Sequence, residues 1–455
     1  MRFRLIFYCL LNGAIISSCS GGGAENNTTD DKAGKQAQKT SNTEQANHTR
    51  TAELEADRHM SANIELPAGF EAQVVHEGVG AARHIAVRDN GDVYIALRKP
   101  KNGKGTVALR DTDEDGEAEK AEYFGDFTGT GVALHKGYLY RTSETAVYRY
   151  PMKKDQLLPE MDRETVLSGL PDKNQHAAKP SEFDNEGHLY INVGAPSNAC
   201  MKEMRTKGST GMDPCPLLKK HAGIWRYKDD KLGQTHDPDN RYASGLRNVV
   251  GMSWNNQTGH LYTMMHGRDQ LHQFFPDLYT QKQSAQLPAG QFHLLKKGDD
   301  VGWPYCYYNQ IKGKKLLNPE YGGNNKKVGR CNQYKEPLIG FPGHWAPNDL
   351  EFYHHRAFPD PFQGGAFIAF HGSWNRAPYP QQGYKVVFVP FDGKKPTRAD
   401  KWSTFAGKFP GKEKLSSPSN AEYRPMGLAV GPNGSLYITD SQEGKVWRVR
   451  YTADT

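Results

Sequence analysis

The sequence predicts an all-β protein, a six-bladed β-propeller preceded by a flexible lipoprotein tether. One short phrase recurs six times along the chain: a turn containing glycine, followed by alternating apolar residues with an aromatic. The chain is also rich in glycine, proline and tyrosine, with 47, 27 and 23 of them among its 455 residues. Such a composition fits many short strands joined by tight turns and long loops.

Each copy of the phrase is expected to be a hairpin turn that leads into a strand. The six turns contain Asn90-Gly91, Lys136-Gly137, Glu186-Gly187, Thr258-Gly259, Gly364-Gly365 and Asn433-Gly434. A strand precedes most of these turns and another follows, so each copy supplies the three or four strands of a propeller blade. The early strand at residues 70–75 is expected to complete the last blade and close the ring. A β-sandwich is the alternative, but it does not require the same turn six times.

The N-terminal 61 residues are expected to lie outside the propeller. Residues 1–19 have a charged start, an apolar core and a small-residue stop at Cys19, which predicts a bacterial lipoprotein signal with lipid attached to Cys19. An ordinary cleaved signal is the alternative, and the apolar run is too short to span a bilayer. Residues 20–61 are polar and predict a flexible linker, and residues 62–455 form the propeller domain. We therefore expect a protein of the bacterial cell envelope, lipid-anchored and facing the periplasm, with Ser20 compatible with outer-membrane sorting.

Four cysteines remain in the mature chain, namely Cys200, Cys215, Cys306 and Cys331. An even number in an oxidising compartment predicts disulfides. Pairing Cys200 with Cys215 and Cys306 with Cys331 closes the shortest loops, but it is one of three possible connectivities. The net charge of +7 is spread along the chain without a basic, aromatic-interleaved block, which argues against nucleic acid as a partner and weakly favours anionic ligands.

An acidic loop between two predicted strands resembles a calcium-binding loop. Asp111, Asp113 and Asp115 alternate before Gly116, and Glu122 occupies the twelfth position of the pattern. Calcium prefers six to eight hard oxygens, which alternate carboxylates around a glycine turn can provide. We expect a structural calcium site with these four acids as ligands; the alternative is a solvated acidic turn.

Polar segments that can carry chemistry fall in the long connections between repeats, where a rigid scaffold commonly builds its site. They are the segment that begins with His176, the pair Arg247-Asn248, the segment from His266 to Asp269, and the loops with Arg376 and Arg424. Alone, each of these side chains is most simply a structural hydrogen-bonding group. Together they would place a titratable base and several cations at one end of a propeller.

These segments, in this order, resemble the soluble glucose/sorbosone dehydrogenases that use pyrroloquinoline quinone (PQQ), including the aldose sugar dehydrogenases. The resemblance runs from about Leu66 to Tyr451. It also depends on Gly302-Trp303-Pro304, on Ala346-Pro347 and on the segment at residues 370–376, which is most similar to the sorbosone dehydrogenase branch.

The resemblance implies a sugar dehydrogenase with PQQ and calcium at one end of the propeller. His176 matches the family's general base, a role that suits a neutral imidazole. Arg247 matches the arginine beside the quinone carbonyl, followed by Asn248, while Arg376 and Arg424 match residues that bind the cofactor. Gly267 and Arg268 match the pair whose backbone carbonyls bind calcium. The sugar, an aldose or a sorbosone-like aldehyde, would be oxidised at C1, and a membrane quinone or a soluble carrier would accept the electrons.

Three positions depart from the family pattern. Ala195 stands where an acid orients the catalytic histidine, Glu422 stands where a second arginine is found, and Arg268 replaces a proline. The rival interpretation is a propeller that binds carbohydrate or protein without chemistry, since the fold hosts many pure binders. A calcium-dependent, lactone-hydrolysing propeller is a third possibility.

Overall fold

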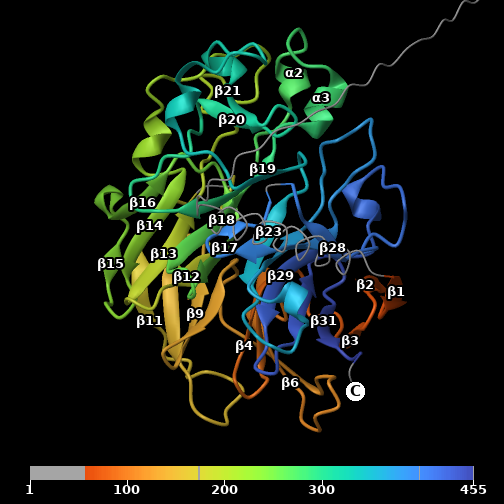
Figure 1. Cartoon of the computed structure of the whole chain (residues 1–455). Helices are drawn as coiled ribbons and strands as arrows, with labels where there is room; N and C mark the ends of the chain where they lie inside the picture. The colour runs from red at the N-terminus through yellow and green to blue at the C-terminus, as the bar shows by residue number, and fades with distance from the viewer. Residues whose placement is uncertain (1–56, 173–174, 399, 454–455) are drawn as a thin grey trace, which may run out of the picture. The chain divides into compact units, whose positions relative to one another are not determined.

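The computed structural model describes residues 57–172, 175–398 and 400–453, and within them six sheets follow one another along the chain (Figure 1). The predicted lipoprotein signal with Cys19, and the linker up to residue 56, lie outside the described residues. One boundary differs from the prediction: the strand β1 (Arg58–Ser61) occupies the end of the expected linker and pairs with β2 (Ile64–Pro67).

The six sheets are the predicted blades, and five of them have four strands. The first contains β4 (Ala82–Val87), β5 (Val93–Lys101), β6 (Lys104–Arg110) and β7 (Lys120–Phe124); the second contains β8 (Val132–His135), β9 (Tyr138–Thr142), β10 (Val147–Pro151), β11 (Glu164–Ser168) and β15 (Gln234–Thr235). The third contains β12 (Ser181–Phe183), β13 (His188–Val193), β14 (Gly223–Lys228) and β16 (Arg241–Ser244); the fourth contains β17 (Val249–Asn255), β18 (His260–Met265), β19 (Gly290–Leu295) and β22 (Ile339–Phe341). The fifth contains β23 (Pro347–Phe352), β24 (Ala366–Phe370), β25 (Lys385–Val389) and β28 (Ser403–Ala406). All strand pairs of the six sheets are antiparallel except that of β11 with β15, which is parallel.

The last blade closes the ring as predicted. It contains β29 (Pro425–Val430), β30 (Leu436–Asp440), β31 (Val446–Tyr451) and the early strand β3 (Phe70–His76), which pairs with β31 from Phe70 opposite Tyr451 onwards. The first strand of every blade contacts the first strand of the next, and β29 contacts β4, so these six strands form a closed inner ring. Pairing between the two ends of the domain therefore completes the last blade and holds the ring closed.

The glycine phrases have one structural role throughout. All six connect the first strand of a blade to its second, and Gly91, Gly137, Gly187, Gly259, Gly364 and Gly434 have φ values between 64° and 90°. Glycine adopts this left-handed backbone without the steric cost that a Cβ brings, which explains why these hairpin turns repeat it. All six turns therefore lie at the same end of the sheets.

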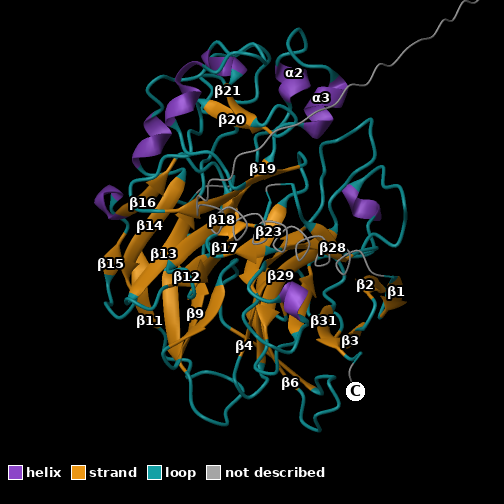
Figure 2. Ribbon diagram, viewed as in Figure 1, coloured by secondary structure: helices purple, strands orange, loops and turns teal. Residues whose placement is uncertain are grey.

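The opposite end carries the long connections. Between β13 and β14, and again around the α-helices α2 (Leu271–Phe274) and α3 (Gln281–Gln286) and the hairpin of β20 (Cys306–Asn309) and β21 (Lys314–Leu317), the chain forms an added layer at the top of Figures 1 and 2. Short 3-10 helices join it at Pro216–Lys219, Pro319–Tyr321 and Gly329–Gln333; others lie at Pro238–Asn240, Asp360–Phe362 and Pro418–Asn420, and the short strands β26 (Phe391–Asp392) and β27 (Lys395–Pro396) form a further hairpin.

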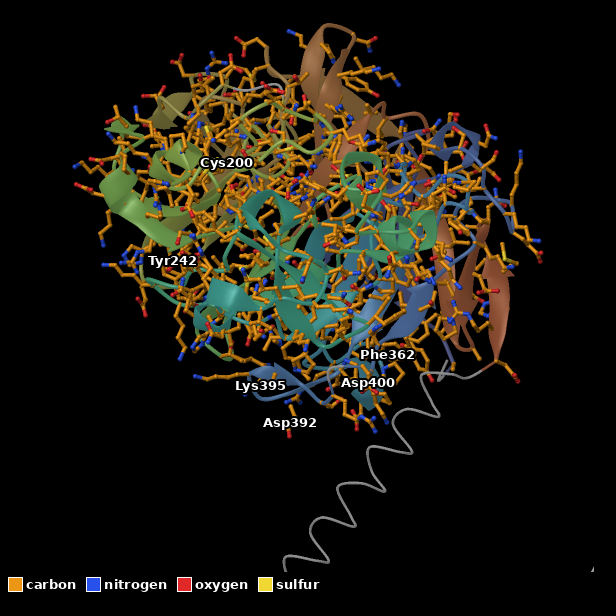
Figure 3. All side chains as sticks on the ribbon, turned by 90° about the horizontal axis from the view of Figure 1, so that it is seen from above. Cys200, Tyr242, Phe362, Asp392, Lys395 and Asp400 are labelled. Atoms are coloured by element: carbon orange, nitrogen blue, oxygen red, sulfur yellow. A yellow bond between two sulfur atoms is a disulfide. The ribbon has the colours of Figure 1, made fainter. Side chains whose placement is uncertain are left out.

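Two disulfides hold the added layer together. Cys200 is bonded to Cys215 and Cys306 to Cys331, the predicted pairing, and all four half-cystines are buried in one apolar cluster with Trp303. Figure 3 looks down on this layer, with Cys200 labelled within it. No helix in the described part of the chain is both long and apolar enough to cross a membrane.

Candidate functional site

The candidate site forms at the end of the propeller that carries the long connections. In an antiparallel blade, the loop that enters the first strand and the loop that joins the second strand to the third lie at the same end. His176, Arg247 and Asn248 precede β12 and β17, whereas the segments that begin at His266 and His371 follow the second strands of their blades. Connectivity alone therefore brings together side chains that are far apart in sequence.

Two adjacent cavities occupy this end, and His176, Asn248 and His266 line both of them. The first has a volume of about 250 Å³ and is also lined by Arg205, Arg247, Gly267, Asp269, His344, Trp374 and Asn375. The second has a volume of about 300 Å³ and is also lined by Arg83, Arg98, Glu144 and Lys179. The structure therefore brings His176, Arg247 and Asn248 together around one of these cavities.

His176 is oriented by a main-chain group. Its Nδ1–H donates to the carbonyl oxygen of Ala195 at 2.5 Å, which leaves the lone pair on Nε2 available as a base. The departure at Ala195 is thus compensated, because the backbone of that residue orients the imidazole where the family uses an acid. Burial, with the nearby charge of Arg247, lowers the pKa of His176 to about 3, so the ring is neutral near pH 7.

The loop that carries His176 packs tightly against the end of β13. His176 has a φ of 54°, in the left-handed region that non-glycine residues rarely adopt and that recurs at functional sites. A Cβ at Gly194 would lie 2.6 Å from the His176 carbonyl oxygen, so only glycine permits this approach. The glycine that ends the Leu189–Gly194 segment therefore helps to place the base.

Arg247 is held rigidly at the wall of the first cavity. Its guanidinium donates to Asp269 Oδ2 at 2.9 Å, to Asn198 O and Oδ1 at 3.1 Å, and to the Gly267 carbonyl at 2.8 Å. Burial raises the pKa of Asp269, but the charge of Arg247 and its neighbours holds that pKa below its usual value. Asn198 was not identified from the sequence, and Asp269 was named only as the end of a polar segment, because Arg247, the partner of both, is distant along the chain.

The second cavity has an excess of positive charge. Arg83, Arg98 and Lys179 line it, with Glu144 as the one acid among its lining residues. The Arg83 Nε is buried and has no hydrogen-bond partner among the described residues. Three cations against one acid give this lining an excess of positive charge, so the cavity suits an anionic ligand. The sequence offered one indication of these two arginines, namely their positions in the first blade. Arg83 lies at the start of the first strand, β4, and Arg98 lies near the end of the second strand, β5.

Two predicted cofactor-binding arginines do not line either cavity. Arg376 donates to the carbonyls of Ala285, Gly343 and Pro380. Arg424 donates to the carbonyls of His371 and Gly372, and its pKa is lowered by burial and by the neighbouring charge of Arg98. The prediction that both arginines bind the cofactor directly is therefore not supported by their positions. Backbone carbonyls, which a sequence does not reveal as partners, hold these guanidiniums.

The predicted calcium pair at Gly267 and Arg268 has a different environment from the one expected. The Gly267 carbonyl already accepts a hydrogen bond from Arg247, so a divalent cation there would lie close to a guanidinium. The Arg268 side chain points into the added layer, where it forms an ion pair with Glu320 at 2.5 Å. As arranged, these residues do not fit calcium unless Arg247 moves.

Glu422, the remaining position that departs from the family pattern, lies outside both cavities. Glu422 is exposed and lines neither cavity, and its backbone N–H donates to the Pro410 carbonyl. The repulsive charge that its sequence position suggested is therefore absent from the ligand-binding space.

The acidic loop connects β6 to β7 at the opposite end of the propeller. Asp111, Asp113, Asp115 and Glu119 offer oxygen atoms within 4.8 Å of one another, whereas Glu122 lies on β7 opposite Ala108 and is not part of the group. The ninth residue of the loop thus takes the place predicted for the twelfth. The strand begins at Lys120, which removes Glu122 from the turn.

Comparison with known proteins agrees with this fold. The model of the TrAA12-like family matches residues 64–452. A protein of Borreliella burgdorferi described as uncharacterized is 28% identical over 414 residues, covering 87% of this chain and 93% of its own length. The PQQ-dependent pyranose dehydrogenase of Coprinopsis cinerea is 25% identical over 283 residues, 53% of this chain and 37% of that enzyme.

Solved structures show the same architecture at low identity. A structure of the carbohydrate-active enzyme family AA12 from Trichoderma reesei superposes with a TM-score of 0.69 at 17% identity, covering 87% of this chain and all of its own. The PQQ domain of Coprinopsis cinerea pyranose dehydrogenase, in its holo form, gives 0.68 at 20% identity, covering 87% and 98%. These likenesses establish the fold, and the matched family model spans nearly the whole of it. The chain belongs to the TrAA12-like family, in agreement with the resemblance to PQQ-dependent sugar dehydrogenases read from its sequence.

Proposed function

We propose that this protein is an oxidoreductase that oxidises a sugar at C1, an aldose or a sorbosone-like aldehyde, with PQQ as the bound hydride acceptor. The observation that carries the proposal is the position of His176, whose Nδ1 is hydrogen-bonded to the Ala195 carbonyl. This residue lines both cavities, the first together with Arg247 and the second together with Arg83, Arg98 and Lys179. PQQ, when bound, supplies the two-electron acceptor for hydride. The named functions of the Coprinopsis cinerea relative support this choice.

The residues present fit an anionic, carboxylate-bearing cofactor. The cations of the second cavity would pair with its carboxylates, and the unpartnered Arg83 Nε would gain a hydrogen bond. Burial lowers the pKa of Lys179 to about 8, so an anion beside it would also restore its preference for the charged form.

The chain's own residues then act on the sugar hydroxyl. His176 Nε2 accepts the proton of the C1 hydroxyl while hydride leaves C1, so that an aldose becomes a lactone and loses two electrons and two hydrogens. Arg247 is a fixed cation whose orientation Asp269 and Asn198 maintain, which suits it to stabilise negative charge that develops on an acceptor oxygen. Electrons would leave to a membrane quinone or a soluble carrier.

Reconstitution tests the proposal, and Arg98→Ala is its most informative variant. Loss of one charge-assisted contact is expected to weaken PQQ binding about tenfold to a hundredfold. PQQ titration followed by fluorescence, together with dye reduction by a panel of aldoses, would measure both properties. Arg424→Ala is expected to have a smaller effect, and Arg398→Ala, an exposed cation paired with Asp400, none.

Absence of both PQQ binding and turnover in the wild-type protein would leave the non-catalytic binding propeller. Lactone cleavage that needs calcium but no quinone would identify the hydrolase instead. The lipid anchor at Cys19, and with it the location in the cell envelope, stays a prediction, since that residue lies outside the described residues.

For the acidic loop we propose structural calcium held by Asp111, Asp113, Asp115 and Glu119. Asp111 Oδ1 is buried without a hydrogen-bond partner, and Gly116 N donates to its other oxygen at 2.7 Å. Glu119→Gln is expected to weaken calcium binding about tenfold, because it removes a charged ligand. Calcium-dependent thermal shifts measure this, with Glu122→Gln as the matched variant; an equal loss in both would contradict the assignment of Glu119.

A further inference from the structure

A third cavity lies beside the first, between the helices α2 and α3 and the loop that follows β24. Its volume is about 400 Å³, within the range of about 300–1,000 Å³ that is usual for small-molecule pockets. Asn375 lines both this cavity and the first one. A molecule whose end reaches the first cavity could therefore extend into the third.

Neutral hydrogen-bonding groups dominate the lining of this third cavity. His272, Gln273, Gln281, Ser284 and Asn375 can each both donate and accept, and Lys207 is the one cation. Among the described residues that line it, none carries a carboxylate. This chemistry suits the hydroxyl groups of a neutral polyol, in contrast to the cationic second cavity, which suits an anion.

Trp374 immediately precedes Asn375, the residue that lines both the first and the third cavity. It lines the first cavity and is 53% exposed, whereas the other six tryptophans of the chain are buried or half-buried. An exposed indole offers a flat apolar face and one N–H donor. Such a face stacks on the C–H surface of a pyranose ring while the ring's hydroxyl groups remain available to polar neighbours.

The backbone around Trp374 is fixed on both sides. Ser373 Oγ donates to Gln381 Oε1 at 2.7 Å, and Asn375 Nδ2 donates to Asp269 Oδ1 at 2.8 Å. The Arg376 guanidinium donates to the carbonyl of Ala285, a residue of α3 that lines the third cavity. The indole is therefore presented by a rigid segment, which lowers the entropy lost when a ligand binds. Arg376 therefore has a structural role, because its hydrogen bond to Ala285 connects the wall of the third cavity to the segment that carries Trp374.

We propose that the third cavity and Trp374 bind the further sugar units of a saccharide whose reacting end occupies the first cavity, so that the preferred substrate is an oligosaccharide. The proposal rests on the proposed function for the identity of the reacting end. Trp374 stacks on the second unit, and the polar groups beyond it hydrogen-bond to the next.

Steady-state kinetics with glucose, maltotriose and cellotriose test the proposal on the reconstituted protein. The wild type is expected to show a lower KM for at least one trisaccharide than for glucose. Trp374→Ala should raise that KM about tenfold, several times more than it raises the KM for glucose. Trp374→Phe should restore most of the loss, and Ile311→Ala, which removes another exposed apolar side chain away from these cavities, should change nothing.

Calorimetric titration of the same sugars separates this proposal from the proposed function. If turnover is absent but a trisaccharide binds and Trp374→Ala weakens that binding about tenfold, the oligosaccharide site stands and only the redox function fails. Three results would overturn the site: glucose bound as tightly as both trisaccharides, equal losses for glucose and trisaccharide in Trp374→Ala, or no trisaccharide binding.

Discussion

Replacing His176 with glutamine is expected to lower kcat by about 10²–10⁴-fold, the usual contribution of a general base. Glutamine can still donate to the Ala195 carbonyl, but it cannot accept the hydroxyl proton. Cofactor affinity should be nearly unchanged, because the cations of the second cavity remain in place. Dye-reduction kinetics and a PQQ titration on the same samples separate these two effects.

The pH profile gives a second readout of the same residue. A base with a pKa of about 3 in the folded protein is unprotonated from pH 8 down to pH 5, so its ionisation should not reduce the rate in that range. An unfolded histidine titrates near 6.5, so His176 makes the folded state lose stability as pH falls below about 6.5 towards 3. His176→Gln should therefore make unfolding less sensitive to acid. The control variant is His260→Gln, at the end of the propeller that carries the glycine turns. An unchanged kcat in His176→Gln would contradict the role of His176 as the general base.

Breaking the buried ion pair between Arg268 and Glu320 is expected to cause a large loss of stability. The two side chains are 1% and 0% exposed, so Arg268→Met leaves a carboxylate without its partner inside the protein. Loss of one member of such a pair costs about 3–5 kcal/mol. Denaturant unfolding of the disulfide-intact protein, at a pH near 7, would measure the change in the free energy of unfolding.

Two further variants test the cause of this loss. Arg268→Met combined with Glu320→Leu should recover most of the stability, because no unpaired charge remains. Arg330→Met breaks an exposed ion pair with Asp213 in the same added layer and should cost no more than about 1 kcal/mol. Equal losses in Arg268→Met and Arg330→Met would contradict the argument from burial.

The propeller could be predicted because its signal is local and repeated. Gly91 and its five equivalents mark turns whose backbone only glycine adopts easily, and a strand of alternating apolar residues follows each. The disulfide pairing was also favoured by sequence, since Cys200 with Cys215 and Cys306 with Cys331 close the shortest loops. The start of the folded domain was misplaced because β1 is short and polar, and its contacts come from Arg58, which donates to the distant carbonyls of Thr404 and Phe405.

The site was predicted only in part. His176, Arg247 and Asn248 were found through the resemblance, and all three line the cavities. Arg98 was missed, and Asp269 was named without a role. Arg376 and Arg424 were given a ligand-binding role that their partners do not support. A sequence shows that an arginine lies in a loop, but it does not show whether a carbonyl or a cavity meets the guanidinium.

The sequence by itself determined the all-β class, the six blades, the ring closure and the disulfide-bearing loops, because hairpin turns and period-two strands depend on neighbouring residues. Only the tertiary structure decided which loop side chains face the common space, that the Ala195 carbonyl orients His176, and that Glu119 rather than Glu122 joins the acidic cluster. These features depend on distances between atoms whose residues are far apart in sequence or on the exact point where a strand begins. Such distances arise only when the six blades have packed around their common axis.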